Sequence, residues 1–419
     1  MATRLLDSQV SVPEAIVRVL EQAGIEFVFG MPGGRTGAIY QALYDHRSTI
    51  RCVLVREEGL AAVMADIYGR LRGRPGVCMG QGAFMLTNGG MGLVEAYLAG
   101  SPVLVLSDLS DGSPFSHHGP YQAGTGDYGT WDARATIAGY TKRVFVSREP
   151  AAAVQNTQLA IKHALAGHPG PVAVLYHSGA LTQTVGPNTT PRLYDTNAYL
   201  PNERPSASAE SITKAVALLN QAQQPVIIAG NGVRMSRAQA QLRELAELLG
   251  LPVATTASGK GVFPETHPLA LGVFGNFGLD AANAVVAAAD LVLAVGTKLG
   301  PTDTANENPE LLDPDVRPSC RSTSKACTPP GPCPRPRPWW VMHSGCSCSS
   351  SPPCAALSSR ASTPPTGSPQ RTIPTPPSIL RPQRPIPRPS CPCASSKSCT
   401  KSCPTTPSLR ATRAKTGCS

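Results

Sequence analysis

The 419 residues of this chain are enough for two or three domains, and a hydrophobic content of 41% indicates a globular protein. The formal net charge of +10 comes from one end, because residues 317–419 contain 15 of the 37 basic residues and no acidic residue. The first 316 residues carry more acidic than basic side chains, which argues against nucleic-acid binding by the folded part.

The number and position of the cysteines indicate whether the protein folds in a reducing or an oxidising compartment. Only Cys52 and Cys78 lie in the first 316 residues, and the other 11 of the 13 cysteines follow residue 317. Two cysteines in a body of this size indicate a reducing environment without a disulfide framework. Because the N-terminus has no apolar segment of signal-peptide length and no run of about 18 apolar residues occurs, we expect a soluble, cytoplasmic protein.

Short apolar runs rich in β-forming residues alternate with helical patterns up to about residue 185. Helical patterns cover residues 13–23, 58–72, 88–99 and 150–166, and the apolar runs between them are EFVFG, RCVLV, GVCMG, PVLVLS, KRVFVS and PVAVLYH. This alternation predicts an α/β domain with a doubly wound parallel sheet covered by helices on both faces. The polar residues 186–206 are predicted to form a linker.

Residues 207–316 repeat the alternation. A helical pattern at 211–221 precedes PVIIAGNGV, a long helix is expected up to about Leu249, and LPVATTA, a helix near 280–289 and DLVLAVGTKLG follow. These elements predict a second doubly wound α/β domain. The segment GNGV is a fragment of a dinucleotide-binding fingerprint, and a tight turn between a strand and a helix is the plainer interpretation.

Residues 317–419 have a different composition. They contain 22 of the 42 prolines together with many Ser, Cys and Arg residues, and they lack apolar periodicity. We therefore expect a disordered, low-complexity tail. A basic segment that binds acidic partners or nucleic acid is the alternative. A zinc site is not expected, because pairs such as Cys346 and Cys348 stand outside any zinc-finger framework.

Three motifs occur in order near the N-terminus. VFGMPGGRTGAIYQAL covers residues 28–43, VREEGLAAVMADIYGR covers 55–70, and a strand, a loop, a helix and a strand follow at 73–107. Their residues and spacing resemble the opening domain of thiamine-diphosphate-dependent enzymes of the acetolactate synthase and 2-keto-acid decarboxylase type. The resemblance covers roughly residues 5–316, and it implies a pyrimidine-binding domain at 1–185 followed by the family's central domain.

The resemblance also implies an activity. Thiamine diphosphate with Mg²⁺ would be the cofactor, and a small 2-keto acid, pyruvate by default, would be the substrate. The implied reaction is decarboxylation followed by carboligation, with simple decarboxylation as the alternative, in a homodimer or homotetramer. FAD is not expected, because GTKLGPTD stands where flavin-binding relatives have RFDDR.

Glu58 matches the family's catalytic glutamate, eight positions before Asp66, and Glu57 takes the place of a family histidine. A carboxyl group that hydrogen-bonds a pyrimidine ring nitrogen favours the imino form of the cofactor, whose own nitrogen then acts as the base. An ordinary solvated acid at the start of a helix is the alternative interpretation.

Further residues match cofactor-binding positions of the family, namely Pro32, Gly33, Gly34, Thr87 and Asn88. Small residues in the turn at 32–34 permit close approach to the pyrimidine, and a plain glycine turn is the alternative. Residues 82–88 read GAFMLTN where the family reads SGPGATN. Bulkier side chains therefore replace the family's Gly-Pro-Gly turn, and we expect them to alter the shape of the pocket.

A histidine pair lies in SHHGPYQAGTGDYG (116–129), which resembles a loop of pyruvate decarboxylase-like enzymes. The resemblance implies that His117 and His118 donate or accept protons at the active site near neutral pH. Two solvated loop histidines are the alternative.

The tail stands where the family continues with a QIDVE-like strand, a VxGDA segment and a third domain whose GDG motif holds magnesium and the diphosphate. No GDG occurs in this chain. Back-translation shifted by one base permits QIDVE at residues 321–325 and VVGDAL at 338–344, in the family's order, so we interpret the tail as read out of frame. We expect the chain to be inactive alone. A non-catalytic subunit that pairs with an intact paralogue is the alternative.

Overall fold

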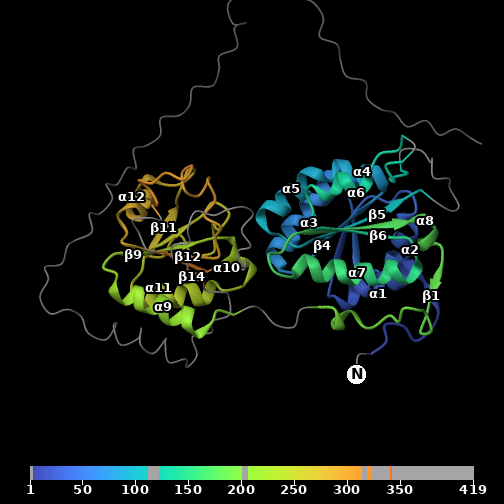
Figure 1. Cartoon of the computed structure of the whole chain (residues 1–419), viewed down its shortest axis with the longest axis horizontal. Helices are drawn as coiled ribbons and strands as arrows, with labels where there is room; N and C mark the ends of the chain where they lie inside the picture. Colours follow the sequence, from blue (N-terminus) through green and yellow to red (C-terminus); the bar gives the residue numbers. More distant parts are fainter. Residues whose placement is uncertain are drawn as a thin grey trace, which may run out of the picture. The chain divides into compact units, whose positions relative to one another are not determined.

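The computed structural model describes residues 3–111, 122–127, 129–200, 206–313, 319–322 and 340–341 of the chain. These residues form two α/β domains, each built on a six-stranded sheet with helices on both faces (Figure 1). The predicted fold class is therefore confirmed. A membrane span would need a longer and more continuously apolar helix than any in the described part of the chain.

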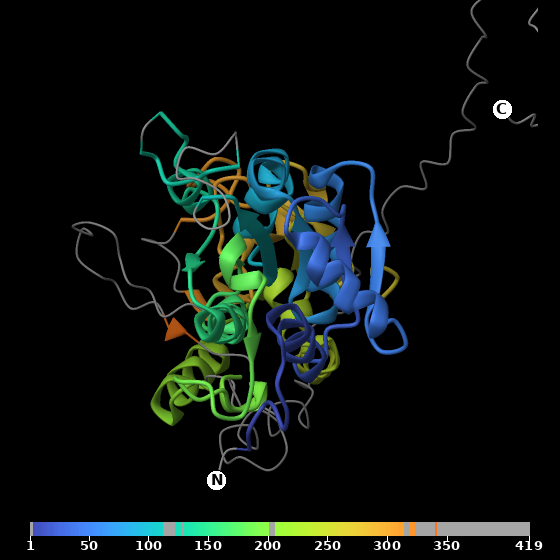
Figure 2. The same cartoon turned by 90° about the vertical axis from the view of Figure 1, so that its right-hand side faces the viewer.

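The N-terminal sheet has the strand order β3-β2-β4-β5-β7-β6, and every neighbouring pair is parallel. The strands β4, β5 and β7 are buried along their whole length, which explains their continuous apolar runs. Strand β3 stands at one edge (Figure 2). The strands are β2 (Phe27–Gly30), β3 (Arg51–Leu54), β4 (Gly76–Gly80), β5 (Val103–Leu109), β6 (Arg143–Ser147) and β7 (Pro171–His177).

Helices cover both faces of this sheet (Figure 1). One face packs against α1 (Val12–Gln22), α2 (Thr36–Asp45), α7 (Pro150–Leu165) and α8 (Ser178–Leu181). The other face packs against α3 (Glu58–Arg72), α4 (Gly82–Asn88), α5 (Gly90–Ala99) and α6 (Ala133–Ala138). A short antiparallel pair joins β1 (Val10–Ser11) to β8 (Thr184–Val185).

The central sheet has the order β11-β10-β9-β12-β13-β14, again with parallel neighbours. On one face lie α9 (Ala209–Gln221), α10 (Asn231–Met235) and α11 (Gln239–Leu249), and on the other lies α12 (Asp280–Ala288). The strands are β9 (Pro225–Ala229), β10 (Val253–Thr255), β11 (Ala270–Val273), β12 (Leu291–Val295), β13 (Ser319–Ser322) and β14 (Trp340–Val341).

Three segments differ from the expectation drawn from the sequence. The long helix expected before Leu249 is broken between α10 and α11, where Arg237 adopts a left-handed φ of 54°. Residues 82–88, expected to form a loop, form α4, because apolar helix-forming residues stand where a Gly-Pro-Gly turn would break a helix. Strands β13 and β14 lie within the segment expected to be disordered, since pairing beside β12 uses backbone groups and needs no apolar pattern.

The segment that follows β8 lies against the N-terminal domain. Leu193 belongs to the core that α1 and α7 form, and its carbonyl oxygen accepts a hydrogen bond from the N–H of Leu5 at 3.2 Å. Thr196, the first residue of the short 3₁₀ helix Thr196–Ala198, is fully buried. The N-terminal domain therefore includes contacts made by residues beyond its last strand.

Helix α3 lies directly on the sheet. A β-carbon on Gly76, the first residue of β4, would lie 2.0 Å from the carbonyl oxygen of Ala65 in α3. A β-carbon on Gly69 of α3 would lie 2.2 Å from the carbonyl oxygen of Pro102, just before β5. Distances this short exclude any side chain at either position, so the two glycines set how closely α3 approaches β4 and β5.

The substitution Gly76→Ala is expected to destabilise the N-terminal domain by about 3 kcal/mol, the upper part of the overpacking range, because the methyl group must displace backbone. Gly37→Ala is the matched control, since a β-carbon on Gly37 in α2 would meet no atom within 4 Å. That change should be neutral or stabilising by up to about 1 kcal/mol. Urea unfolding followed by circular dichroism measures both, and equal effects would contradict the close packing.

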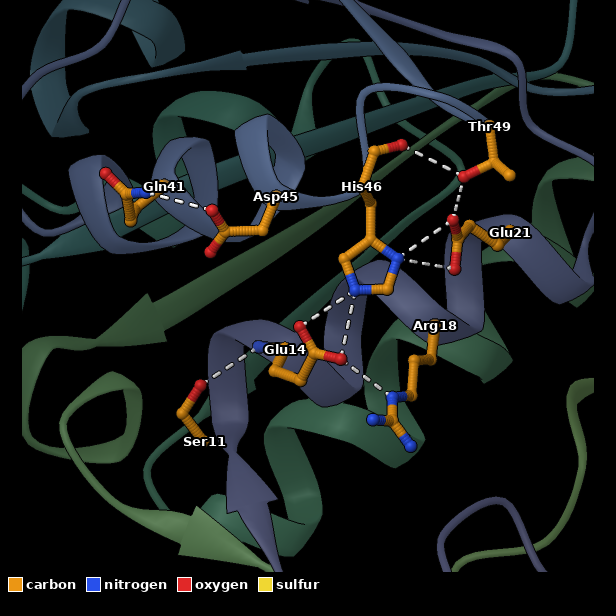
Figure 3. A network of polar contacts seen from close by, with 8 residues as sticks. All are labelled: Ser11, Glu14, Arg18, Glu21, Gln41, Asp45, His46 and Thr49. Carbon is orange, nitrogen blue, oxygen red and sulfur yellow. Dashed lines mark hydrogen bonds and ion pairs between the residues drawn. The ribbon is translucent and has the colours of Figure 1, made fainter.

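His46, which follows α2, is held between two glutamates of α1 (Figure 3). Its Nε2 lies 3.0 Å from the carboxylate of Glu14, and its Nδ1 lies 3.0 Å from that of Glu21. Arg18 donates to Glu14 at 2.8 Å, and the hydroxyl of Thr49 donates to Glu21. Burial would lower the pKa of His46, but the two carboxylates outweigh it and raise that pKa above 6.5.

The substitution His46→Gln is expected to cost about 1 kcal/mol of stability near pH 6 and less at higher pH. Because folding raises the pKa of His46, its stabilisation is fully present below the unfolded pKa and is lost as the pH rises through the folded pKa. Urea unfolding from about pH 5.5 to about pH 9 tests this, with Gln41→Ala on α2 as the control. A loss that does not change with pH would contradict the charged contact.

Candidate functional site

The predicted site residues lie where the parallel strands of the N-terminal sheet end. The turn at 32–34 follows β2, Glu58 begins α3 after β3, and α4, which ends at Asn88, follows β4. The strands β5 and β7 end beside each other at Leu109 and His177. Open parallel α/β sheets bind their ligands at this carboxyl edge, so the fold places the predicted residues at a binding edge.

Glu58 is buried, with only 5% of its surface exposed, although it is the first residue of α3. Its Oε2 accepts a hydrogen bond from Asn88 Nδ2 at 3.3 Å. Within the described part of the chain, no group donates to its Oε1. A carboxyl group held through one oxygen and open at the other can bind a proton on a ligand nitrogen. The structure therefore brings Glu58 and Asn88 together.

Glu57 has a different role from its neighbour. Its exposed carboxylate accepts hydrogen bonds from the backbone N–H groups of Gly59 at 2.7 Å and Leu60 at 3.0 Å. These bonds satisfy two of the N–H groups that an α-helix leaves without partners in its first turn. Glu57 thus anchors the start of α3 and leaves the carboxyl group of Glu58 free for other contacts.

The glycines of the turn at 32–34 are confined by the protein itself. A β-carbon on Gly33 would lie 2.6 Å from Gln81 Oε1, and one on Gly34 would lie 2.5 Å from Asp108 Oδ2. Gly34 also has a φ of +54°, in the left-handed region that favours glycine. Packing of this turn against the end of β5 therefore requires glycine at position 34, whereas a side chain at position 33 would only displace the flexible side chain of Gln81.

Thr87 makes its side-chain hydrogen bond within α4 and not with Glu58. Thr87 is exposed, and its hydroxyl donates to the carbonyl oxygen of Ala83 at 2.6 Å within α4. His117 and His118 lie outside the described residues. The functional roles of these residues, and those of Pro32, Gly33, Gly34, Glu58 and Asn88, remain predictions.

A histidine–aspartate pair at the ends of β5 and β7 was not predicted from the sequence. Nδ1 of His177 lies 3.0 Å from the carbonyl oxygen of Asp111 and 3.3 Å from its Oδ2. Both residues are buried, and Nε2 of His177 has no hydrogen-bond partner in the part of the chain that the structure describes. His177 could have been found in the sequence, because it is a polar residue at the end of the apolar run PVAVLYH, and parallel strands end at the ligand-binding edge.

Neither cysteine of the N-terminal domain is a candidate nucleophile. Burial raises the pKa of Cys78 to about 12 and that of Cys52 to about 11, so both thiols stay protonated at neutral pH. The described ranges also contain no group of three His, Cys, Asp or Glu residues that could hold a metal ion.

Backbone atoms of the central domain fill the space beside the GNGV turn (residues 230–233). A β-carbon on Gly230 would lie 2.5 Å from the carbonyl oxygen of Gly296, and one on Gly232 would lie 2.6 Å from the α-carbon of Gly296. Glycine at these positions lets the turn after β9 pack against the end of β12. This contact accounts for the glycines as parts of a tight turn between a strand and a helix.

Comparison with known sequence families gives two matches. Residues 10–125 match the family described as thiamine pyrophosphate enzyme, N-terminal TPP binding domain. Residues 212–318 match thiamine pyrophosphate enzyme, central domain. The two matches fall on the two α/β domains of the structure in the same order.

Curated relatives agree with these matches. The chain is 34% identical over 287 residues to a probable acetolactate synthase large subunit of Methanocaldococcus jannaschii, an alignment that covers 68% of this chain and 46% of that protein. It is 33% identical over 322 residues to an acetolactate synthase of Mycobacterium bovis, covering 74% of this chain and 49% of the relative. The chain spans about half the length of the curated relatives it matches. The chain belongs to the thiamine pyrophosphate-dependent, acetolactate synthase-like enzyme family, and it contains that family's N-terminal and central domains.

Proposed function

We propose that these domains serve the thiamine-diphosphate-dependent decarboxylation of a 2-keto acid, pyruvate by default, followed by carboligation. The observation that carries the proposal is the buried carboxyl group of Glu58 at the ligand-binding edge of the N-terminal sheet. The names of the relatives, which are acetolactate synthases, support the same class of reaction.

The residues present fit the pyrimidine half of thiamine diphosphate. Oε1 of Glu58, which no described group occupies, would hold a proton shared with a pyrimidine ring nitrogen. Asn88 holds the other oxygen and thereby keeps the carboxyl group from rotating away. When bound, thiamine diphosphate supplies the electron sink that decarboxylation requires.

The other candidate residues have supporting roles in this proposal. The backbone of the turn at 32–34 would border the pyrimidine, and His117 and His118 would transfer protons to or from the substrate. Mg²⁺ and the diphosphate need oxygen ligands, and carboxylates commonly supply them. Residues 317–419 contain no acidic side chain, so this part of the chain offers no carboxylate for that half of the site.

An out-of-frame reading accounts for this composition. The match to the central domain ends at residue 318, close to Asp315, the last acidic residue of the chain. A one-base shift before residue 321 permits the strand sequence QIDVE that the family has at this place. We therefore assign the proposed activity to the protein that the gene would encode if that base were restored.

The purified 419-residue chain, supplied with thiamine diphosphate and Mg²⁺, is expected to release no carbon dioxide from pyruvate, because the diphosphate half of the site lacks carboxylates. A one-base change that restores the frame before codon 321 is expected to produce turnover. Measurable turnover by the unaltered chain would refute the proposed inactivity. A restored protein that decarboxylates no 2-keto acid would refute the proposed function.

In the frame-restored protein, Glu58→Gln is expected to lower kcat by about 10²–10⁴-fold, because an amide cannot share a proton with the pyrimidine nitrogen as a carboxyl group does. Glu57→Gln is the control. It weakens the cap of α3 and should cost about 1 kcal/mol of stability while kcat is retained. Steady-state decarboxylation rates and thermal unfolding measure both, and equal kcat values for the two variants would contradict the role of Glu58.

Simple decarboxylation is the second candidate activity, and the sequence around His117 and His118 favours it. The two reactions give different products from pyruvate, since carboligation joins two substrate molecules and simple decarboxylation leaves an aldehyde. Chromatography of the products formed by the frame-restored protein distinguishes them.

We further propose that the chain pairs through an apolar surface on α3 and α5. The side chains on this surface follow helical spacing on both helices, and each is at least 40% exposed: Leu60, Val63, Ile67 and Leu71 on α3, and Met91, Val94 and Leu98 on α5. The two helices touch, because a β-carbon on Gly92 of α5 would lie 2.6 Å from the backbone nitrogen of Val63. Contiguous exposed apolar surfaces mark interfaces, and a twofold dimer is the commonest arrangement.

The wild-type chain is expected to sediment as a dimer, and Ile67→Lys is expected to weaken dimerisation by about 100-fold, because it buries a charge in the α3–α5 surface. Phe277→Lys is the control, since Phe277 is 77% exposed in the central domain. Sedimentation velocity over a range of concentrations measures both. A monomeric wild-type chain would contradict self-association. Co-purification with an intact paralogue would instead favour the alternative of a non-catalytic subunit.

A further inference from the structure

Asp108, near the end of β5, joins two segments of the candidate site. Its Oδ2 accepts a hydrogen bond from the backbone N–H of Arg35 at 2.7 Å, and its Oδ1 accepts one from the N–H of Gly82 at 3.0 Å. Arg35 directly follows the turn at 32–34, and Gly82 is the first residue of α4. One carboxylate therefore spans the two segments that present candidate cofactor residues.

The connection continues through α4 to Glu58. Asn88, the last residue of α4, donates to the carboxyl group of Glu58. The hydroxyl of Tyr140 donates to the carbonyl oxygen of Leu86 and holds the same end of the helix. Because α4 is a short helix with its own backbone hydrogen bonds, a displacement of Gly82 also displaces the amide that positions Glu58.

A carboxylate at position 108 carries an energetic cost for the folded protein, because it is buried. The side chain of Asp108 has no exposed surface. Burial raises its pKa, and the N–H groups of Gly82 and Arg35 offset this only in part. A carboxyl group whose pKa is raised on folding destabilises the folded state once the pH is high enough to ionise it. Residues kept at a cost in stability are concentrated at functional sites.

We propose that Asp108 is a positioning residue of the candidate cofactor site, and that its carboxylate sets the spacing between the turn at 32–34 and α4. The inference rests on the proposed function for the identity of the ligand and on the two hydrogen bonds for the contact itself. An asparagine cannot replace Asp108, because it offers one acceptor oxygen where two N–H groups each approach a separate oxygen.

Amide-resolved hydrogen exchange on the full chain tests this inference with Asp108→Asn. At least one of the N–H groups of Arg35 and Gly82 should exchange about tenfold faster, the factor that corresponds to about 1.4 kcal/mol, while the melting temperature does not fall. Asp290→Asn is the matched control, because the Asp290 carboxylate accepts the N–H groups of Gln223 and Gln224 at 2.6 and 2.9 Å in the central domain. It should leave exchange at the N-terminal pair unchanged.

The pH dependence of exchange separates positioning from general stabilisation. In the wild-type chain, protection of the Arg35 and Gly82 amides should be lost as the pH falls through the raised pKa of Asp108, and Asp108→Asn should lack this profile. Unchanged exchange in Asp108→Asn would overturn the inference. A lower melting temperature with faster exchange throughout the N-terminal domain would overturn it as well.

Thiamine diphosphate with Mg²⁺ is the second probe on the same samples. It should slow exchange at Arg35 and Gly82 in the wild-type chain and slow it less in Asp108→Asn. Equal slowing in both proteins would overturn the positioning role. If the cofactor slows neither amide in the wild-type chain, pyrimidine binding by this chain fails, and the ligand-free exchange still decides the role of Asp108.

Discussion

The close packing of α3 on the N-terminal sheet is the constraint on which the candidate site depends. Gly76 and Gly69 leave no space for a side chain between the helix and the strands, so α3 lies against β4 and the start of β5. At the other end of the helix, Glu58 is buried at the carboxyl edge of the sheet, where a β-carbon on Gly80 would lie 3.3 Å from its Cγ. Acidic residues in the first turn of a helix are ordinarily solvated, and the packing of α3 removes Glu58 from that environment.

Backbone N–H groups place the carboxylates around this site. Glu57 uses both oxygens to cap α3, and Asp108 uses both to hold the turn after β2 and the start of α4. Glu58 is different, since a side-chain amide holds one of its oxygens and no described group occupies the other. Two carboxylates thus bind backbone N–H groups through both oxygens, and among the described residues the third is held through one oxygen only.

Much of the site could be predicted from the sequence because its motifs are local. The motifs around the turn at 32–34 and around Glu58 fall within single strand–turn–helix units, and the structure puts both at the same edge. Asp108 and His177 could not be predicted in this way. Their partners stand 73 and 66 residues away in the chain, and only the strand order β2-β4-β5-β7 makes them neighbours. The helical state of residues 82–88 and the break at Arg237 likewise depend on packing and on one left-handed residue.

The sequence by itself determined the fold class and many of the longer strands and helices, because apolar runs and helical periodicity reflect which surfaces must leave water. It predicted α3, β4 and β7 at the bounds observed in the structure. It also carried the motifs by which the family is recognised. Only the tertiary structure decided which of two adjacent glutamates is buried and which caps the helix. That choice follows from the distance between α3 and the sheet, a quantity that no pattern along the chain contains.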